Sequence, residues 1–156
     1  GPLARADLRE TLERQLRASV ARGARVRTGG TRPDMRGFFL EPAVLVDCDV
    51  SMPAFIEETF GPLAAITRVR DEDEAVEVAN HSQFGLGGNV WSRDSERGLA
   101  VARRIQSGGV FINGMTHSDP RLPFGGIRDS GYGRELHRFG IHEFVNIKTV
   151  WLPAAQ

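Results

Sequence analysis

The sequence predicts an α/β fold in which a mostly parallel sheet is flanked by helices. Between residues 64 and 113, short apolar runs that suit strands alternate with helical patterns. The connections between them are short, and such a succession forms right-handed crossovers and a parallel sheet. Glycine, which is costly inside helices and strands, accounts for 18 of the 156 residues and is concentrated after residue 84. This enrichment indicates turns and close backbone approaches in the second half of the chain.

The first forty-six residues predict one helix and one strand. Residues 3–22 form an amphipathic helical pattern that Gly23 can end. Apolar residues recur in it every four positions, at Leu8, Leu12, Leu16 and Val20. Residues 28–42 are rich in glycine and proline, which predicts an irregular connection. The apolar run at residues 43–46 then suits a strand.

The alternating region has five predicted elements. They are strands over 64–69, 86–91 and 110–113 and helices over 71–80 and 95–106. Asp71 stands at the N-cap of the first helix, and Glu74 follows three residues later as in a capping box. Gly108 and Gly109 follow the second helix and indicate its end.

The periodic pattern stops after Asn113. Residues 114–133 hold prolines and glycines without periodicity, and a stretch of this length is often a functional loop. The loop leaves the carboxyl end of a predicted parallel strand, where open α/β sheets place their ligand sites. A short helix is expected over 134–139. Residues 144–152 alternate as a strand with no adjacent hairpin partner, so its edge needs another chain or a distant sheet edge.

The composition is that of an ordinary globular protein and excludes several classes. With 40% hydrophobic and 26% charged residues, a disordered tail, a collagen-like repeat and a disulfide scaffold are excluded. Basic and acidic residues number 20 each, and a net charge of zero argues against nucleic acid as a partner. No apolar run approaches the roughly 20 residues that cross a bilayer, so no membrane is expected. The single cysteine, Cys48, cannot form an internal disulfide, which favours a reducing cytoplasm.

Three isolated motifs have structural interpretations. The four histidines show no metal-ligand spacing, so no metal site is expected. Cys48 lies between Asp47 and Asp49, whose charges disfavour a thiolate, and a buried thiol is the better interpretation. The glycine-rich run at residues 85–88 begins a strand instead of joining a strand to a helix. That placement indicates backbone packing rather than phosphate binding.

Two further segments are informative together. The sequence of residues 57–62 is EETFGP, and some sixty residues later that of residues 123–135 is PFGGIRDSGYGRE. This combination resembles the aldehyde dehydrogenase superfamily, over nearly the whole chain. Within it, FINGMTHSDP at residues 111–120 and EFVNIKTVW at residues 143–151 resemble the succinate-semialdehyde dehydrogenase group.

The resemblance implies an activity and a place in a larger enzyme. Enzymes of this superfamily oxidise an aldehyde to a carboxylic acid with NAD or NADP, through a cysteine nucleophile and a glutamate that activates water. The family's nucleophile precedes the segment that opens this chain, so residues 1–140 match the carboxyl-terminal part of the catalytic domain, with an active-site loop at 113–133. Cys48 is not the nucleophile in this alignment, and the chain alone is expected to be inactive. Residues 141–156 match an oligomerisation strand that packs against a neighbouring subunit.

The resemblance also assigns roles to individual residues. Glu58 matches the glutamate that holds the nicotinamide ribose hydroxyls, and Phe60 the aromatic beside it. Phe124 matches an aromatic lining the aldehyde tunnel, and Ser118 a serine that holds the distal carboxylate of succinate semialdehyde. Arg121 lies close enough in sequence to assist by charge. The expected partners are a small aldehyde and further copies of the chain.

Two alternatives remain open at this point. One is a dehydrogenase that acts on another aldehyde. The other is a binding or assembly module without chemistry that acts through its terminal strand.

Overall fold

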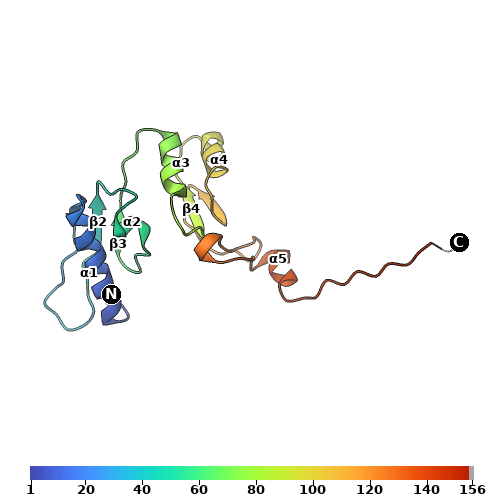
Figure 1. Ribbon diagram of the computed structural model, residues 1–156, viewed down its shortest axis with the longest axis horizontal. Helices are drawn as coiled ribbons and strands as arrows, with labels where there is room; N and C mark the ends of the chain where they lie inside the picture. The colour runs from blue at the N-terminus through green and yellow to red at the C-terminus, as the bar shows by residue number, and fades with distance from the viewer. Residues whose placement is uncertain (155–156) are drawn as a thin grey trace. The chain divides into compact units, whose positions relative to one another are not determined.

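The computed structural model describes residues 1–154, coloured along the chain in Figure 1. The chain divides into two compact units, residues 1–81 and the part that begins at Ser82. Each unit contains its own small sheet and its own helices.

The first unit packs a long helix against a three-stranded sheet. Its elements are α1 (Ala6–Ala21), β1 (Arg25–Thr28), β2 (Ala43–Val46), α2 (Pro53–Ile56), β3 (Leu63–Ala65) and α3 (Glu72–Asn80). The central strand β2 pairs antiparallel with β1 and parallel with β3. Alternate residues of β2, Ala43 and Leu45, point into the core, where Leu12, Met52 and Leu63 are also buried.

The buried face of α1 differs from the predicted one. The buried residues are Arg9, Leu12, Gln15 and Ser19, whereas Val20 is 40% exposed. A repeat of four residues drifts by about 40° per step on a helix with 3.6 residues per turn. The leucine line therefore winds away from the core, and polar residues three or four positions apart take its place.

The second unit is built on two parallel strands. It contains β4 (Gly87–Val90), α4 (Ser95–Ala102), β5 (Gly109–Ile112), the 3-10 turn η1 (Arg128–Ser130) and α5 (His137–His142). β4 pairs with β5 in parallel from Gly87 opposite Gly109. The crossover between them contains α4, whose N-cap Asp94 accepts a hydrogen bond from the Arg97 backbone N–H at 3.0 Å.

Most predicted elements are confirmed, with shifts at their ends. β2 has the predicted bounds, and Asp71 caps α3 by accepting from the Glu74 N–H at 2.9 Å. Of the three strands predicted over 64–113, β4 and β5 pair in parallel, whereas β3 pairs in parallel with β2 in the other small sheet, so the predicted single parallel sheet is not formed. The short β1 and α2 carry no clear periodic signal and were not predicted.

The region after residue 133 differs most from expectation. Glu135 pairs with Phe124 in an antiparallel bridge, which keeps the chain extended there and delays α5 to His137. The strand predicted over 144–152 is not formed in this single chain: the segment runs on from α5 without strand pairing (Figure 1). A strand needs an edge to pair with, and no other segment among residues 1–154 pairs with this one.

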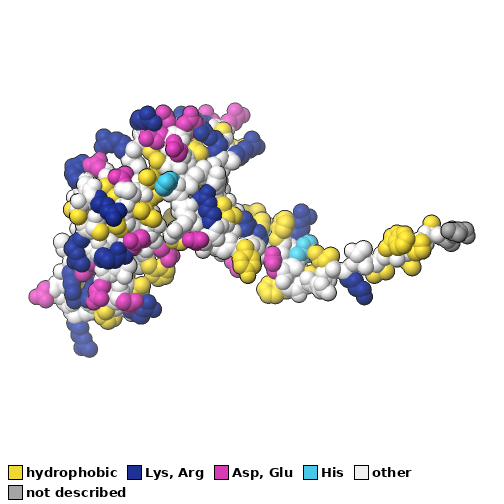
Figure 2. All heavy atoms as spheres, viewed as in Figure 1, with side chains coloured by type: hydrophobic (Ala, Val, Ile, Leu, Met, Phe, Trp, Pro, Cys, Tyr) yellow, Lys and Arg dark blue, Asp and Glu magenta, His cyan; other side chains and the backbone are white. Residues whose placement is uncertain are grey.

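The side chains of this C-terminal segment are open to solvent. Phe144 is 91% exposed, and Ile147 and Trp151 are each 79% exposed. Figure 2 shows hydrophobic side chains along this part of the chain. Within residues 1–154, no helix is both long enough and apolar enough to cross a membrane.

Candidate functional site

One face of α1 holds the segment 54–61 at three successive places. The hydroxyl of Ser19 accepts a hydrogen bond from the Ala54 backbone N–H at 3.0 Å. One turn earlier along the helix, the amide of Gln15 reaches the pair of glutamates in the segment. Leu12 packs against Gly61, where a Cβ atom would lie 2.2 Å from the leucine Cδ1. The glycine of the EETFGP motif, Gly61, therefore lies in close contact with α1.

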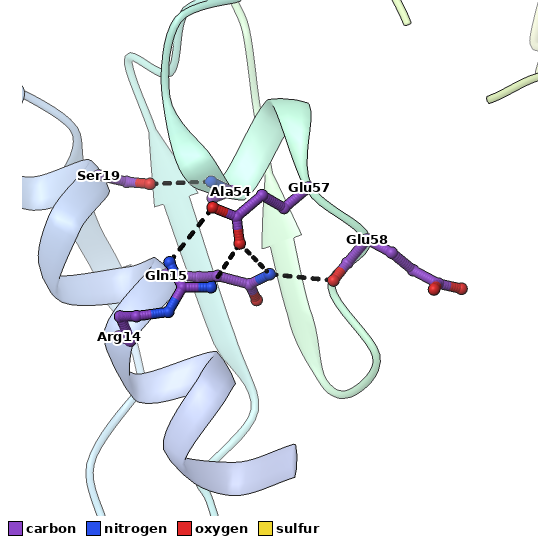
Figure 3. A network of polar contacts seen from close by, with 6 residues as sticks. All are labelled: Arg14, Gln15, Ser19, Ala54, Glu57 and Glu58. Atoms are coloured by element: carbon purple, nitrogen blue, oxygen red, sulfur yellow. Dashed lines mark hydrogen bonds and ion pairs between the residues drawn. The ribbon is translucent and has the colours of Figure 1, made fainter. Parts of the chain in front are cut away.

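Glu57 is the glutamate that ties this segment to α1 (Figure 3). Its Oε1 and Oε2 accept hydrogen bonds from the Arg14 guanidinium at 3.2 and 2.5 Å. Its Oε2 also accepts from Nε2 of Gln15 at 3.1 Å. Two consecutive side chains of α1 thus converge on one carboxylate of a segment far away in sequence, and Glu57 has a structural role.

These contacts shift the ionisation of Glu57. Hydrogen bonds from Arg14, and secondly from Gln15, hold the pKa of the Glu57 carboxyl below its usual range. Because the pKa is lowered in the folded state, the contact stabilises the fold at pH values above the ordinary carboxyl pKa of about 4.3. This stabilisation is lost as the pH falls from that value through the lowered pKa.

Glu58, the next residue, is arranged differently. Its backbone oxygen accepts a hydrogen bond from Gln15 Nε2 at 3.0 Å, while its side chain is exposed and points away from Arg14 and Gln15 (Figure 3). Among residues 1–154, no group forms a hydrogen bond or an ion pair with this carboxylate. Phe60 is 64% exposed. A carboxylate with open acceptor positions fits the ribose hydroxyl contacts that the family resemblance implies for Glu58.

The second unit contains the long loop, which begins at the carboxyl ends of the two strands. The Asn113 N–H donates to the Val90 oxygen at 2.8 Å, and the Asn113 side chain exchanges two hydrogen bonds with the Ser92 backbone. The loop then turns back. Thr116 packs against Gly87, the first residue of β4, where a Cβ atom would lie 2.6 Å from the threonine methyl.

The loop leaves the carboxyl end of β5 as expected, and its PFGG part then lies near the amino ends of β4 and β5. The Gly85 oxygen accepts hydrogen bonds from Gly108 N–H at 2.9 Å and Ile127 N–H at 3.1 Å. A Cβ atom on Gly108 would lie 1.6 Å from the Gly125 oxygen. The approach at Gly108 needs glycine. In the run 85–88, a Cβ atom on Gly85 would lie 2.6 Å from Ile127 Cγ1, which agrees with the interpretation of the run as close packing.

Phe124 is half-buried where two hollows of the second unit meet. One, of about 350 Å³, is lined among others by Leu86, Phe124, Tyr132 and Arg134. The other, of about 270 Å³, is lined among others by Phe111, His117, Leu122 and Phe124. The bridge to Glu135, with N–H···O distances of 2.9 and 2.7 Å, holds the Phe124 backbone in place.

Ser118 is exposed and lines neither hollow, although both of its sequence neighbours line the smaller one. A tight turn separates it from Phe124, since the Leu122 N–H donates to the Asp119 oxygen at 2.9 Å. The Arg121 guanidinium pairs with the Asp119 carboxylate at 2.6 Å and holds the pKa of that carboxyl well below its usual range. The charge of Arg121 is therefore already compensated by Asp119.

Cys48 is a core residue of the first unit. It is 4% exposed, and its backbone N–H donates to the Ile66 oxygen at 3.1 Å. Burial raises the pKa of its thiol, which keeps it protonated and unreactive at neutral pH. The interpretation of Cys48 as a buried thiol is confirmed. Within the described part of the chain, no three histidine, cysteine or acidic side chains form a group that could hold a metal ion.

The four predicted ligand-binding residues are divided between the two units. Glu58 and Phe60 belong to the first unit, and Ser118 and Phe124 to the second. Sequence reasoning missed Gln15, to which it gave no role. The signal was available, because Leu12, Gln15 and Ser19 are spaced three and four apart, as residues of one helical face are.

Comparison with known proteins identifies the family. The aldehyde dehydrogenase family model matches residues 1–150. The chain is 48% identical to a succinate semialdehyde dehydrogenase [NAD(P)+] of Escherichia coli over 97% of its own length and 33% of that protein. It is 49% identical, with the same coverage, to a succinate-semialdehyde dehydrogenase [NADP(+)] of Mycobacterium bovis.

A solved structure agrees with the sequence comparison. Succinic semialdehyde dehydrogenase from Streptococcus pyogenes, in complex with NADP+, matches with a TM-score of 0.92 and 40% identity, over 97% of this chain and 33% of that one. The chain thus spans about a third of the length of the relatives it matches. On this evidence the chain belongs to the aldehyde dehydrogenase family.

Proposed function

We propose that this chain is the carboxyl-terminal part of an NAD- or NADP-dependent dehydrogenase that oxidises succinate semialdehyde to succinate. The observation that carries the proposal is the 48–49% identity to succinate-semialdehyde dehydrogenases over 97% of the chain. In this proposal the cysteine nucleophile and the general base belong to the part of the enzyme that lies outside these residues. The buried, protonated Cys48 supports that assignment.

Glu58 and Phe60 are the proposed cofactor contacts. When bound, the nicotinamide dinucleotide supplies the acceptor for the hydride that leaves the substrate carbon. Glu58 accepts hydrogen bonds from the ribose hydroxyls through its open carboxylate, and Phe60 offers an exposed aromatic face beside it. The separation of roles between Glu57, which holds the segment, and Glu58, which is left open, supports this assignment.

Phe124 and Ser118 are the proposed substrate contacts. Phe124 lies half-buried at the border of two hollows, which suits an aromatic wall for an aliphatic chain. Ser118 is exposed, and its hydroxyl donates to the distal carboxylate of the substrate. The ion pair of Asp119 with Arg121 leaves the carboxylate-binding role to the serine hydroxyl.

Ser118→Ala in the full-length enzyme is expected to impair succinate semialdehyde selectively. The loss of a hydrogen bond to a carboxylate costs about 1.5–3 kcal/mol of transition-state stabilisation, which lowers kcat/KM roughly 10- to 100-fold. The kcat/KM for an uncharged aldehyde of similar length is expected to be nearly unchanged. Ser118→Thr, which keeps the hydroxyl, is expected to retain the preference for succinate semialdehyde over the uncharged aldehyde. Steady-state kinetics on both aldehydes measure the effect. Equal losses on the two substrates would mean that Ser118 only shapes the loop.

A role in assembly is the second candidate, and the exposed apolar segment 144–152 favours it. Val145, Ile147 and Trp151 are 53%, 79% and 79% exposed, and their backbone has no strand partner within residues 1–154. Such a segment gains by pairing with an equivalent segment of another copy. We propose that it contributes an oligomerisation strand to a homo-oligomer.

The chain is therefore expected to form a dimer or larger species, and a chain ending at Gly140 is expected to be more dissociated. Light scattering coupled to gel filtration measures both molar masses. Monomers in both cases, at concentrations well above micromolar, would contradict the assembly role.

A further inference from the structure

The Gln15 side chain holds two consecutive residues, Glu57 and Glu58, of the segment 54–61. Its amide nitrogen has two hydrogens, and it donates to Glu57 Oε2 at 3.1 Å and to the Glu58 backbone oxygen at 3.0 Å. The side chain is only 1% exposed. The amide orientation is determined by its partners, because the reverse orientation would place Oε1 against a carboxylate and a carbonyl oxygen.

The other end of the same amide has no partner. Gln15 Oε1 is buried and accepts no hydrogen bond from the described part of the chain. An apolar side chain of similar size would avoid the cost of this unsatisfied acceptor. The Oε1 end of the amide therefore lowers the stability of the fold, whereas the Nε2 end holds Glu57 and Glu58.

Holding Glu57 also sets the direction of Glu58. The backbone at Glu57 is extended, with φ −91° and ψ 154°. Successive side chains of an extended chain point to opposite sides. With Glu57 drawn toward α1 by Arg14 and Gln15, the Glu58 carboxylate faces away from the helix (Figure 3).

We infer that Arg14 and Gln15 are positioning residues for the cofactor-binding carboxylate of Glu58, one through the Glu57 side chain and the other through both glutamates. The inference rests on the proposed role of Glu58. The inference gives neither residue a direct contact with the dinucleotide. Both act by limiting the directions that the carboxylate can take before the cofactor arrives, which reduces the ordering cost of binding.

Gln15→Leu in the full-length enzyme tests the inference, since it removes both donors and keeps an apolar volume in the core. We expect the Kd for the dinucleotide to rise about tenfold, as for the loss of a hydrogen-bonded positioning contact. The KM for the aldehyde is expected to stay within about twofold. Fluorescence quenching by the dinucleotide gives the Kd, and steady-state kinetics give the KM.

Ser19→Ala is the matched control. Ser19 lies one turn along the same buried face and holds the same segment at Ala54, away from Glu58. The substitution Ser19→Ala removes a comparable buried hydrogen bond. It is therefore expected to lower thermal stability with little change in the dinucleotide Kd. An equal rise in Kd for both variants would show a general loss of packing and overturn the inference.

A double substitution separates this inference from the proposed function. If Gln15 acts through Glu58, Gln15→Leu has little further effect on the dinucleotide Kd in a Glu58→Gln background. A full additive effect there would overturn the inference. If Glu58→Gln alone leaves the Kd unchanged, the proposed role of Glu58 fails. If Glu58→Gln weakens binding and Gln15→Leu does not, only the positioning role fails.

Arg14→Ala provides a test that does not disturb the core. The Arg14 side chain is 53% exposed, so its loss threatens folding less than a change at Gln15. Because the ion pair is exposed, we expect a rise in dinucleotide Kd of only about two- to threefold, with the aldehyde KM unchanged. If Gln15→Leu does not fold, this variant decides, and an unchanged Kd would overturn the inference.

Discussion

Residues 1–156 alone are expected to form no NADH or NADPH from succinate semialdehyde. The proposed reaction needs an exposed thiolate and a general base, and the one cysteine of the chain is buried with a raised pKa. The relatives that carry the activity in their names are about three times as long as this chain. The formation of reduced cofactor by purified protein, with the full-length enzyme as positive control, measures the effect.

Cys48→Ala provides the control for this prediction. Turnover that persists in this variant would contradict the assignment of the nucleophile to another part of the enzyme, because it would show a reaction that needs no cysteine of this chain. Turnover that is present and then lost with Cys48→Ala would place the nucleophile at Cys48. Either result would overturn the proposal that this chain is an incomplete catalytic unit.

Glu58→Gln in the full-length enzyme is expected to weaken dinucleotide binding and slow hydride transfer by roughly 10- to 100-fold. Glutamine keeps the size of the side chain but removes the charge that strengthens hydrogen bonds from the ribose hydroxyls, worth about 1.5–3 kcal/mol. The aldehyde KM is expected to change less. Single-turnover measurements with the deuterated aldehyde separate hydride transfer from product release.

Glu10→Gln is the control for the loss of a negative charge. Glu10 is an exposed glutamate on α1, outside the contacts that hold the segment 54–61. Its substitution is expected to leave cofactor binding and rate unchanged. If Glu58→Gln matches this control in both dinucleotide Kd and hydride-transfer rate, the role proposed for Glu58 is wrong.

The elements that could be predicted are those whose signals are local. Asp71 and Glu74 indicate the start of α3 because an N-cap satisfies a backbone N–H three residues away. The apolar run at β2 matches its strand because that strand lies in the middle of a sheet. The strand expected over 144–152 is not formed in the single chain, because strand formation depends on a partner edge that the local sequence pattern does not reveal.

The candidate site shows the same division. The sequence alone identified Glu58 and Phe60 as a motif, because the residue types and their order are specific. It did not show that Glu57 and Glu58 differ in their contacts, because this difference depends on which carboxylate meets α1. Only the folded chain brings Arg14 and Gln15, some forty residues earlier, against Glu57 and leaves Glu58 open.

Residue type and short-range spacing were therefore enough to recognise the family and to place the elements with local signals, such as β2 and α3. The tertiary structure decided which face of α1 is buried, that the loop after β5 returns to the amino ends of the strands, and which ionisable side chains are engaged. The physical reason is that burial and ion pairing are properties of segments in contact. Arg14, for example, pairs with Glu57 only because the fold brings α1 against the segment 54–61.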